Sequence, residues 1–307
     1  MEIIIDNLTK KFGDKIALDD ISLVVGQGMF GLLGQNGAGK TTLMRIITTL
    51  LNKTAGEVTV CGIPVEKSGE VRRMVGYLPQ DFDLYPGMRV GDALDYLGIL
   101  SGMDRKTRKG NIQKVLRQVN LSNCKNLKVK ALSGGMKRRL GIAQAILHDP
   151  KVLIVDEPTA GLDPEERIRF RNLLSELAKD RIVMLSTHIV EDIQSTCENI
   201  AILDQGKLLY QGSVQELMMS AREHVFTAAV NKDAADAIKE QYLVTGLTGY
   251  GNEVNIRILA EEKPFEEAVV CEPTMEDAYM YRLQQEKTKG KYESKIVGTG
   301  GAAHEVH

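Results

Sequence analysis

The chain has 307 residues, of which 43% are hydrophobic, enough to bury one large core and a smaller second one. Its 39 basic and 41 acidic residues give a formal net charge of -2, which excludes a global field that would draw the protein to nucleic acid or to an anionic membrane. No window approaches the roughly 18 apolar residues of a membrane helix, and the opening MEIIIDNLTKKFG lacks the apolar core of a signal peptide, so we expect neither a membrane span nor secretion.

The first half of the chain predicts short strands, one helix after a glycine-rich loop, and a helical insert. Apolar or alternating runs predict strands at 3–8, 16–25, 29–33, 56–60 and 75–78. A helix at 42–51 follows the third of these strands. Apolar residues at helical spacing over 90–119 predict a helical subdomain at about 90–145.

The second half alternates strands and helices before its character changes near Ser220. We expect strands at 152–155, 182–186, 200–204 and 207–210, with helices at 165–179 and 190–197. This alternation indicates a mostly parallel sheet covered on both faces. Further short strands at 225–230, 243–247 and 254–258 surround one helix. The predicted domains are therefore a large α/β domain at 1–220, a small α+β domain at 221–283, and a lysine- and glycine-rich tail without fixed structure at 284–307.

The four cysteines, Cys61, Cys124, Cys197 and Cys271, lie far apart and form no C-x-x-C pair. This spacing argues against a zinc site or a redox dithiol, and it is typical of buried thiols in a reducing compartment. We therefore expect the protein in the cytoplasm.

The segment between strand 29–33 and the next helix has the pattern of a phosphate-binding loop. Its glycines let backbone N–H groups turn toward a phosphate, and the helix N-terminus adds its dipole. We expect Lys40 to bridge the β- and γ-phosphates of ATP and the Thr41 hydroxyl to bind Mg²⁺. A merely flexible turn would not need a Lys-Thr pair at this offset. The predicted ATP-binding residues are Gly34, Gln35, Asn36, Gly37, Ala38, Gly39, Lys40, Thr41 and Thr42.

Two carboxylates, Asp156 and Glu157, follow the apolar strand 152–155, at the edge where open α/β sheets bind ligands. Asp156 is expected to hold Mg²⁺, and Glu157 to act as general base on the attacking water. Alone, Asp-Glu-Pro after a strand is typical of a helix N-cap. Lys40 upstream favours the catalytic interpretation.

A second helix-start anion site precedes the predicted helix 137–147, and one ATP does not need two such sites in a single chain. In isolation, a capped helix with permissive glycines would be the simpler interpretation. The residues are Leu132, Ser133, Gly134, Gly135 and Met136.

With Ser133-Gly134-Gly135 between a phosphate loop and an Asp-Glu strand, residues 1–220 resemble the ABC ATPase family, whose signature has this place. The resemblance implies that the signature serves the ATP of a second subunit. It implies that Gln80 reaches Mg²⁺ and the lytic water, and that His188 senses the γ-phosphate. A lone Gln or His after a strand would not indicate these roles. The order of the motifs along the chain does indicate them. The predicted catalytic residues are Glu157, Lys40, His188 and Gln80, and the predicted metal ligands are Thr41, Gln80 and Asp156.

Further implications of the resemblance concern the base and the dimer. Phe12 is implied to stack on adenine, in the place of the family's more usual tyrosine. Met136 stands where glutamine is common in the signature. Neither departure touches the phosphate chemistry. The loop Gly161, Leu162 and Asp163 is implied to contact the other subunit.

Segment 272–280 resembles the C-terminal segment of ATPases that serve drug- and polysaccharide-export systems. It favours an exporter over an importer, while an ordinary capped terminal helix would use the same residues. The main alternative is a soluble ABC ATPase acting on nucleic acid or the ribosome. The single cassette, the short heptad-free segment 81–132 and the pI near 6.3 argue against it. A non-enzymatic regulatory binder would be expected to lack Lys40 or Glu157.

The sequence thus predicts an α/β protein with a P-loop core of the ABC ATPase type, an antiparallel β edge, a helical subdomain and a small C-terminal domain. Expected cofactors are ATP and Mg²⁺. Expected partners are a second copy or a homologous ATPase subunit in a head-to-tail dimer, and a transmembrane permease subunit at the cytoplasmic face of the membrane. We expect no nucleic-acid partner. The transported substrate contacts the permease, so this sequence does not encode it.

Overall fold

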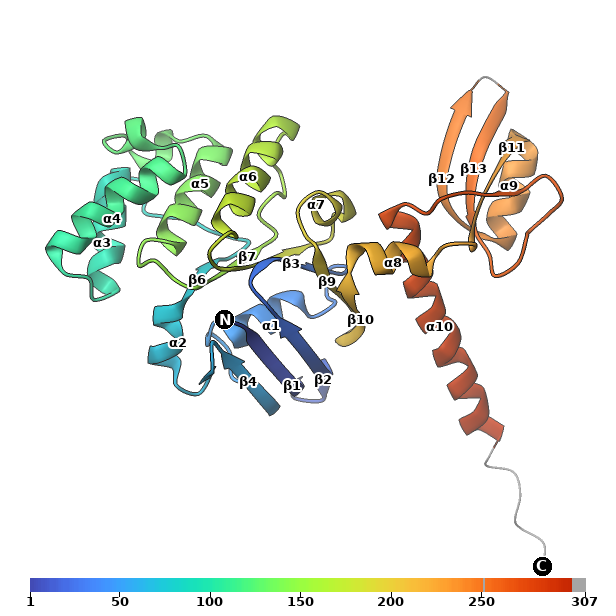
Figure 1. The fold of residues 1–307 in the computed structure, drawn as a ribbon, viewed down its shortest axis with the longest axis horizontal. Coiled ribbons are helices and arrows are strands. Elements are labelled where there is room, and N and C mark those ends of the chain that lie inside the picture. Colours follow the sequence, from blue (N-terminus) through green and yellow to red (C-terminus); the bar gives the residue numbers. More distant parts are fainter. Residues whose placement is uncertain (251, 300–307) are drawn as a thin grey trace, which may run out of the picture. The chain divides into compact units, whose positions relative to one another are not determined.

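The computed structural model describes residues 1–250 and 252–299, and it divides into two compact units, Met1–Gln211 and Gly212–His307 (Figure 1). The boundary lies a few residues before the predicted one near Ser220, because helix α8 (Val214–Ser220) groups with the second unit. Its N-terminus is fixed by a capping box between Ser213 and Glu216.

The first unit is built on a six-stranded sheet in the order β10-β9-β3-β8-β7-β6. The central pairs β3/β8, β7/β8, β6/β7 and β3/β9 are parallel. All five residues of β7 are buried, as expected for a parallel strand covered on both faces. The strands are β3 (Gly28–Leu33), β6 (Val75–Leu78), β7 (Val152–Asp156), β8 (Ile182–Thr187), β9 (Asn199–Asp204) and β10 (Lys207–Ser213).

An antiparallel sheet in the order β2-β1-β4-β5 forms the predicted β edge. Strands β1 and β2 alternate buried and exposed residues over much of their length, because one face packs on the core and the other faces solvent. The strands are β1 (Ile3–Phe12), β2 (Lys15–Val25), β4 (Ala55–Val60) and β5 (Ile63–Pro64).

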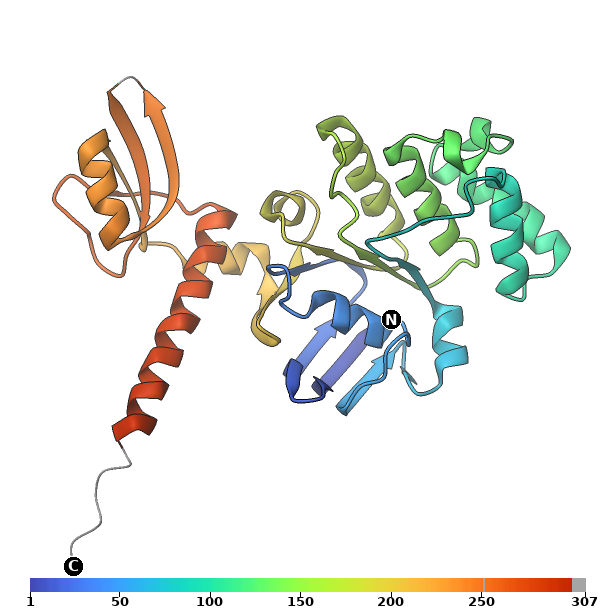
Figure 2. The same ribbon diagram turned by 180° about the vertical axis from the view of Figure 1, so that it is seen from behind.

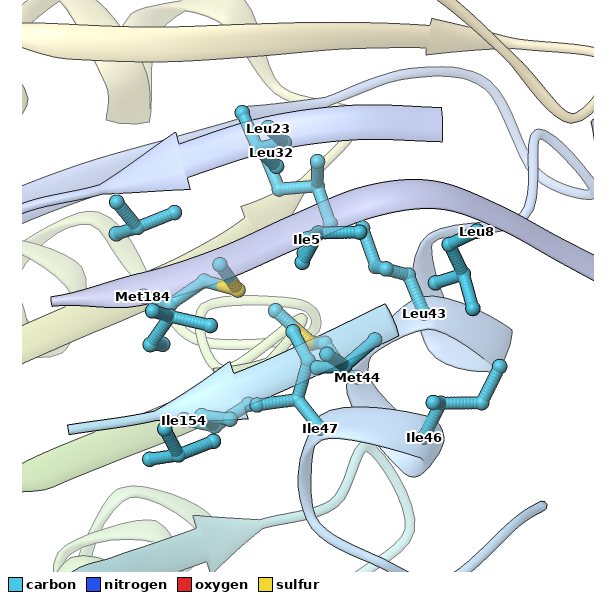
Figure 3. Close-up of a cluster of buried hydrophobic side chains, with 14 of the residues drawn as sticks. Ile5, Leu8, Leu23, Leu32, Leu43, Met44, Ile46, Ile47, Ile154 and Met184 are labelled. Atoms are coloured by element: carbon cyan, nitrogen blue, oxygen red, sulfur yellow. The ribbon is translucent and has the colours of Figure 1, made fainter. Parts of the chain in front are cut away.

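Helix α1 (Lys40–Ile47) shares one hydrophobic cluster with both sheets. Its Leu43 and Met44 are fully buried and lie close to Ile5 of β1 and Ile154 of β7 (Figure 3). Each such side chain contributes roughly 1.5–3 kcal/mol on burial. The core therefore fixes the helix that begins directly after the glycine-rich loop.

The remaining helices of the first unit include the predicted helical subdomain. Asp104 caps α4 by accepting from the N–H groups of Lys106 and Thr107. Helices α5 and α6 lie side by side in both views (Figure 1 and Figure 2), and Arg139 of α5 contacts Glu166 of α6 at 3.4 Å. The helices are α2 (Ser68–Met74), α3 (Val90–Leu100), α4 (Arg105–Gln118), α5 (Gly134–Ala145), α6 (Pro164–Leu177) and α7 (Val190–Gln194), with 3-10 turns at Ser122–Cys124 and Val129–Ala131.

The second unit has a four-stranded sheet in the order β12-β13-β11-β14, with α9 (Lys232–Gln241) packed on it. Its small core includes Ala228, Ala235, Ile256 and Ile258. The strands are β11 (Val225–Asn231), β12 (Leu243–Tyr250), β13 (Glu253–Leu259) and β14 (Val269–Val270).

A buried carboxylate joins the last helix of the second unit, α10 (Met275–Thr299), to its sheet. Asp277 of α10 accepts from Thr274 Oγ1 at 2.8 Å and from Arg257 Nη2 at 2.5 Å, and it also bonds the Thr245 hydroxyl. Burial acts to raise the pKa of Asp277, but these hydrogen bonds outweigh it and hold the pKa below its usual value. The segment that resembles exporter ATPases thus has a structural role in this chain.

Helix α10 extends to Thr299, where the sequence predicted a tail without fixed structure from 284. The composition is too polar to form a core, but its Gln, Glu and Lys residues are good helix formers, and a helix satisfies its backbone hydrogen bonds locally. Residues 300–307 of the predicted tail lie outside the described residues. Within the described part of the chain, no helix has the length and hydropathy needed to cross a bilayer.

Candidate functional site

The glycine-rich loop between β3 and α1 has a backbone that only glycine can adopt at two positions. Gly37 and Gly39 have φ of 86° and 107°. A Cβ on Gly39 would also lie 2.8 Å from the side chain of Leu18 and 2.9 Å from the carbonyl of Ala17. The loop is therefore built to turn sharply against β2 and to open into the first turn of α1.

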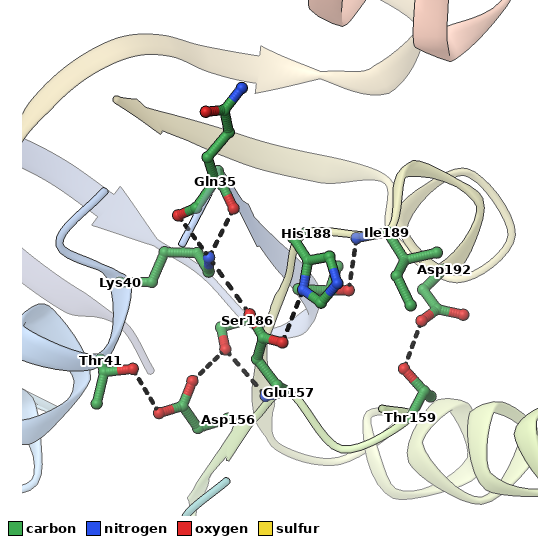
Figure 4. A network of polar contacts seen from close by, with 12 residues as sticks. Gln35, Lys40, Thr41, Asp156, Glu157, Thr159, Ser186, His188, Ile189 and Asp192 are labelled. Carbon is green, nitrogen blue, oxygen red and sulfur yellow. Dashed lines mark hydrogen bonds and ion pairs between the residues drawn. The ribbon is translucent and has the colours of Figure 1, made fainter. Parts of the chain in front are cut away.

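Lys40, the first residue of α1, is buried with its ammonium group already paired. Its Nζ donates to the carbonyls of Gly34 at 2.6 Å and Gln35 at 3.1 Å, and it lies 3.4 Å from Oε1 of Glu157 (Figure 4). These partners compensate the cost of burying the charge. They also hold the ammonium at the mouth of the loop.

The next residue, Thr41, donates its hydroxyl to Oδ2 of Asp156 at 2.9 Å. The other carboxylate oxygen of Asp156 accepts from Ser186 Oγ, and both Asp156 and Ser186 are buried. A hydroxyl and a carboxylate oxygen side by side are ligands that suit Mg²⁺, so these residues fit the predicted metal. Burial and the nearby Asp156 raise the pKa of Tyr77 to about 12, so its phenol is neutral beside this pair.

Glu157 lies at the end of β7 in a left-handed backbone conformation, with φ of 45°. Its N–H donates to the carbonyl and the hydroxyl of Ser186, each at 3.1 Å, which holds the turn. Its Oε2 lies 2.7 Å from Nδ1 of His188. Since its other oxygen faces Lys40, the Glu157 carboxylate joins the phosphate loop to the segment after β8 (Figure 4).

A cavity of about 940 Å³ lies over these groups. Phe12 borders it with 49% of its surface exposed, and Lys10 Nζ lies 4.8 Å from the centre of the Phe12 ring. The lining residues are Phe12, Lys15, Ile16, Ala17, Gln35, Asn36, Gly37, Ala38, Gly39, Lys40, Thr41, Thr42, Gln80, Glu157, Gln205 and Gly206.

Several residues of this site were missed by the sequence analysis. Lys15, Ile16 and Ala17 follow Phe12 across the β1–β2 hairpin, so their place in the wall follows from the turn at Gly13. Gly206 donates its N–H to the carbonyl of Ala38 at 3.0 Å. This contact joins segments far apart in the sequence, so no local pattern predicts it. The same is true of Ser186, which pairs with Asp156 in the β7–β8 register.

The signature residues 132–136, all of which are described, do not line this cavity. Ser133 caps α5 by accepting from the N–H of Met136 at 3.3 Å. Gly134 instead borders a separate hollow of about 400 Å³ next to Gln80. The carbonyl of Gln80 accepts from Arg138 Nη1 at 2.6 Å, so α5 and the Gln80 segment are joined.

The loop Gly161, Leu162 and Asp163 leads into α6. Gly161 has φ of 75° and Asp163 caps the helix by accepting from the N–H of Glu166 at 2.9 Å. Gly161 and Asp163 are exposed. The loop is thus ordered by contacts within its own chain, and Gly161 and Asp163 remain accessible to a partner.

Comparison with known proteins identifies the family. The family model described as ABC transporter matches residues 18–160. The uncharacterized ABC transporter ATP-binding protein YxlF of Bacillus subtilis (strain 168) is 35% identical over 244 residues, covering 79% of this chain and 81% of that protein. The Nod factor export ATP-binding protein I of Burkholderia lata is 37% identical over 217 residues, covering 70% of this chain and 71% of that protein.

Solved structures agree on the fold. A solved ATP-binding subunit of an ABC transporter superposes with a TM-score of 0.64 and 26% identity, covering 72% of this chain and 93% of the other. A dimeric bacterial ABC transporter cassette gives a TM-score of 0.62 and 26% identity, covering 69% and 98%. The predicted α/β fold is confirmed, and the chain belongs to the ATP-binding subunits of ABC transporters, whose activity is ATP hydrolysis.

Proposed function

We propose that this ATPase powers export through a separate transmembrane permease, as one half of a head-to-tail dimer at the cytoplasmic face of the membrane. The observation that carries the direction is the 37% identity to the Nod factor export ATP-binding protein I, of which this chain covers 71%. Segment 272–280 adds a resemblance to exporter ATPases, although its contacts are also those of a structural helix cap.

The proposed chemistry places each charged group around the γ-phosphate. Lys40 balances its negative charge, and Glu157 takes a proton from the water that attacks phosphorus as the bond to the ADP oxygen breaks. His188, bonded to Glu157 at 2.7 Å, orients the carboxylate. Mg²⁺ held by Thr41 and Asp156, with Gln80 nearby, would supply charge neutralisation at the β- and γ-phosphates.

The separation of the two proposed anion sites supports a head-to-tail dimer. The signature at Ser133 is a helix start away from the chain's own cavity, and a helix start attracts phosphate. A second copy turned to face the first would bring its Ser133 to the phosphates held by Lys40. The exposed loop at Gly161–Asp163 would then contact that second copy.

The permease is proposed to dock on an exposed apolar surface of the helical subdomain. Tyr85, Tyr96, Ile99 and Leu100 have 41–65% of their surfaces exposed. Three of them, Tyr85, Tyr96 and Leu100, help to line a groove of about 460 Å³. Clustered exposed apolar side chains mark protein interaction sites. The surface begins a few residues after Gln80, which borders the ATP cavity. A displacement of this surface by the permease would therefore be transmitted to the cavity.

Membrane fractionation tests this docking. Wild-type chain expressed with its permease should sediment with membranes, whereas Leu100→Glu should move to the soluble fraction with its basal ATPase rate unchanged. Leu247→Glu is the matched control, since Leu247 is also exposed but lies in the second unit. Equal membrane recovery of the two variants would reject this surface. For direction, the purified complex should hydrolyse ATP without any substrate-binding protein, and an absolute requirement for one would favour import.

A further inference from the structure

Two side-chain contacts, side by side in Figure 4, join the segment after β7 to the segment after β8. The first is the contact of Glu157 with His188. The second links Thr159, two residues after Glu157, to Asp192, four residues after His188: Thr159 Oγ1 donates to Asp192 Oδ2 at 2.5 Å.

The second contact is far better shielded than the first. Asp192 is 0% exposed and Thr159 is 1% exposed, whereas 44% of the His188 side chain is exposed. The remaining carboxylate oxygen of Asp192 lies 3.5 Å from Nη1 of Arg171 on α6. Both oxygens therefore have partners, as a buried carboxylate requires.

Main-chain pairing fixes the separation of these two segments only at their start, where β7 pairs with β8 as far as Asp156 and Ser186 and the N–H of Glu157 donates to Ser186. Helix α7, which carries Asp192, has five residues, too few to be stable by its own hydrogen bonds. Glu157 sits in a left-handed turn, and His188 is followed by a turn closed by the Thr187 hydroxyl on the N–H of Ile189 at 2.9 Å. Each turn is ordered locally, so beyond Glu157 and Ser186 the spacing of the two segments depends on the side-chain contacts between them.

We propose that Asp192 is a positioning residue: anchored by Arg171, it holds Thr159 and so keeps Glu157 at hydrogen-bonding distance from His188. This inference rests on the proposed role of Glu157 as the general base. Asp192 does not touch the nucleotide cavity, and it acts only through the geometry of the reacting groups. Its loss should therefore slow the chemical step and leave ATP binding intact.

The decisive variants are at Thr159, because Asp192→Ala would leave Arg171 without its buried partner and endanger the fold. Thr159→Val keeps the shape of the side chain and removes the donor. Thr159→Ser keeps the donor and removes the methyl group. If the hydroxyl matters, Val is the damaging change; if only packing matters, Ser is the damaging one.

We expect Thr159→Val to lower kcat roughly 10- to 100-fold with KM for ATP within about twofold of wild type, and Thr159→Ser to retain most of kcat. Thr48→Val is the matched control: Thr48 is also buried, and its hydroxyl donates to main-chain carbonyls of α1, those of Met44 at 2.9 Å and Arg45 at 3.3 Å. It should keep its kcat. Melting temperatures of all three variants verify that they are folded.

Wild-type kcat in Thr159→Val, or a greater loss in Thr159→Ser than in Thr159→Val, would overturn the inference. Glu157→Gln is measured in parallel. If Glu157→Gln turns over ATP normally, the assigned base is wrong and the proposed function itself needs revision. If Glu157→Gln is inactive and Thr159→Val is not, only the positioning role of Asp192 fails.

Discussion

The ammonium of Lys40 lies 3.4 Å from the carboxylate of Glu157, and both side chains are at least nine-tenths buried. The two residues come from opposite ends of the cassette sequence and meet only in the fold. Their charges are opposite, and in the proposed reaction they have different tasks: Lys40 balances the negative charge of the γ-phosphate, and Glu157 activates the water that attacks it.

Lys40→Ala should abolish ATP hydrolysis. The variant removes the cation at the phosphates and the lysine partner of the buried Glu157 carboxylate. Loss of one such electrostatic contact lowers kcat by roughly 10²–10³-fold. A phosphate-release assay measures this directly. Undiminished turnover would reject the assigned site.

Glu157→Gln should separate nucleotide binding from cleavage. The amide keeps the shape of the side chain but cannot take a proton from water, so ATP stays uncut and the closed dimer cannot relax. Gel filtration with ATP should show a stable dimer, which the wild type forms only briefly. A dimer that persists without ATP would contradict this expectation.

Adding Ser133→Arg to that variant should abolish the ATP-dependent dimer. A bulky side chain at the start of α5 would enter the phosphate pocket of the facing copy and block closure sterically. The double variant should elute as a monomer with ATP. If it still dimerises, the signature does not complete the partner copy's site.

Asp277→Ala should destabilise the second unit while leaving hydrolysis by the first intact. Breaking a buried ion pair costs about 3–5 kcal/mol, and we expect about 3 kcal/mol because Arg257 is 30% exposed. Glu276→Ala removes the same charge from the same helix turn at an exposed position and is the control. Thermal melts compare the two, and equal melting temperatures would show that the Asp277 cluster is dispensable.

The same cluster predicts a dependence on pH. Because the pKa of Asp277 is lower in the folded state than in the unfolded chain, its stabilising contribution is complete above the unfolded value of about 3.9 and is lost as pH falls through the lower folded value. Acid melts should therefore show the wild type losing more stability than Asp277→Ala below about pH 4. Parallel acid curves would contradict the assigned contacts.

The chain should not bind DNA or RNA at physiological salt. Nucleic-acid binding depends on neutralising phosphates with clustered basic residues, and the formal charge of -2 supplies no excess. Fluorescence anisotropy with labelled oligonucleotides tests this. Salt-sensitive binding at submicromolar concentration would favour a soluble ABC ATPase of the nucleic-acid class.

Much of this structure could be predicted from local patterns in the sequence. The sharp turn before α1 could be predicted because its glycines, Lys40 and Thr41 are neighbours in the chain and lie within one turn of backbone. Asp156 and Glu157 could be placed because a wholly apolar strand precedes them. In each case the pattern that supports the prediction lies within a few consecutive residues.

Contacts that depend on strand order could not be predicted. Ser186 meets Asp156 only because β7 and β8 are adjacent in the sheet, and Asp192 meets Thr159 for the same reason. Helix α10 shows the reverse limit: polar composition predicted a tail without fixed structure from residue 284, but the helix extends to Thr299, because composition alone does not decide whether a segment is helical.

The two ends of the cavity differ in burial and in polarity. The end at Lys40 and Asp156 consists of buried charges with several partners each, whereas the end at Phe12 is a half-exposed ring with no hydroxyl. An aromatic face stacks on any base, so discrimination among nucleotides at this end is weak. The enzyme should therefore accept GTP in place of ATP with little loss of rate, and cellular nucleotide concentrations would decide which one it consumes.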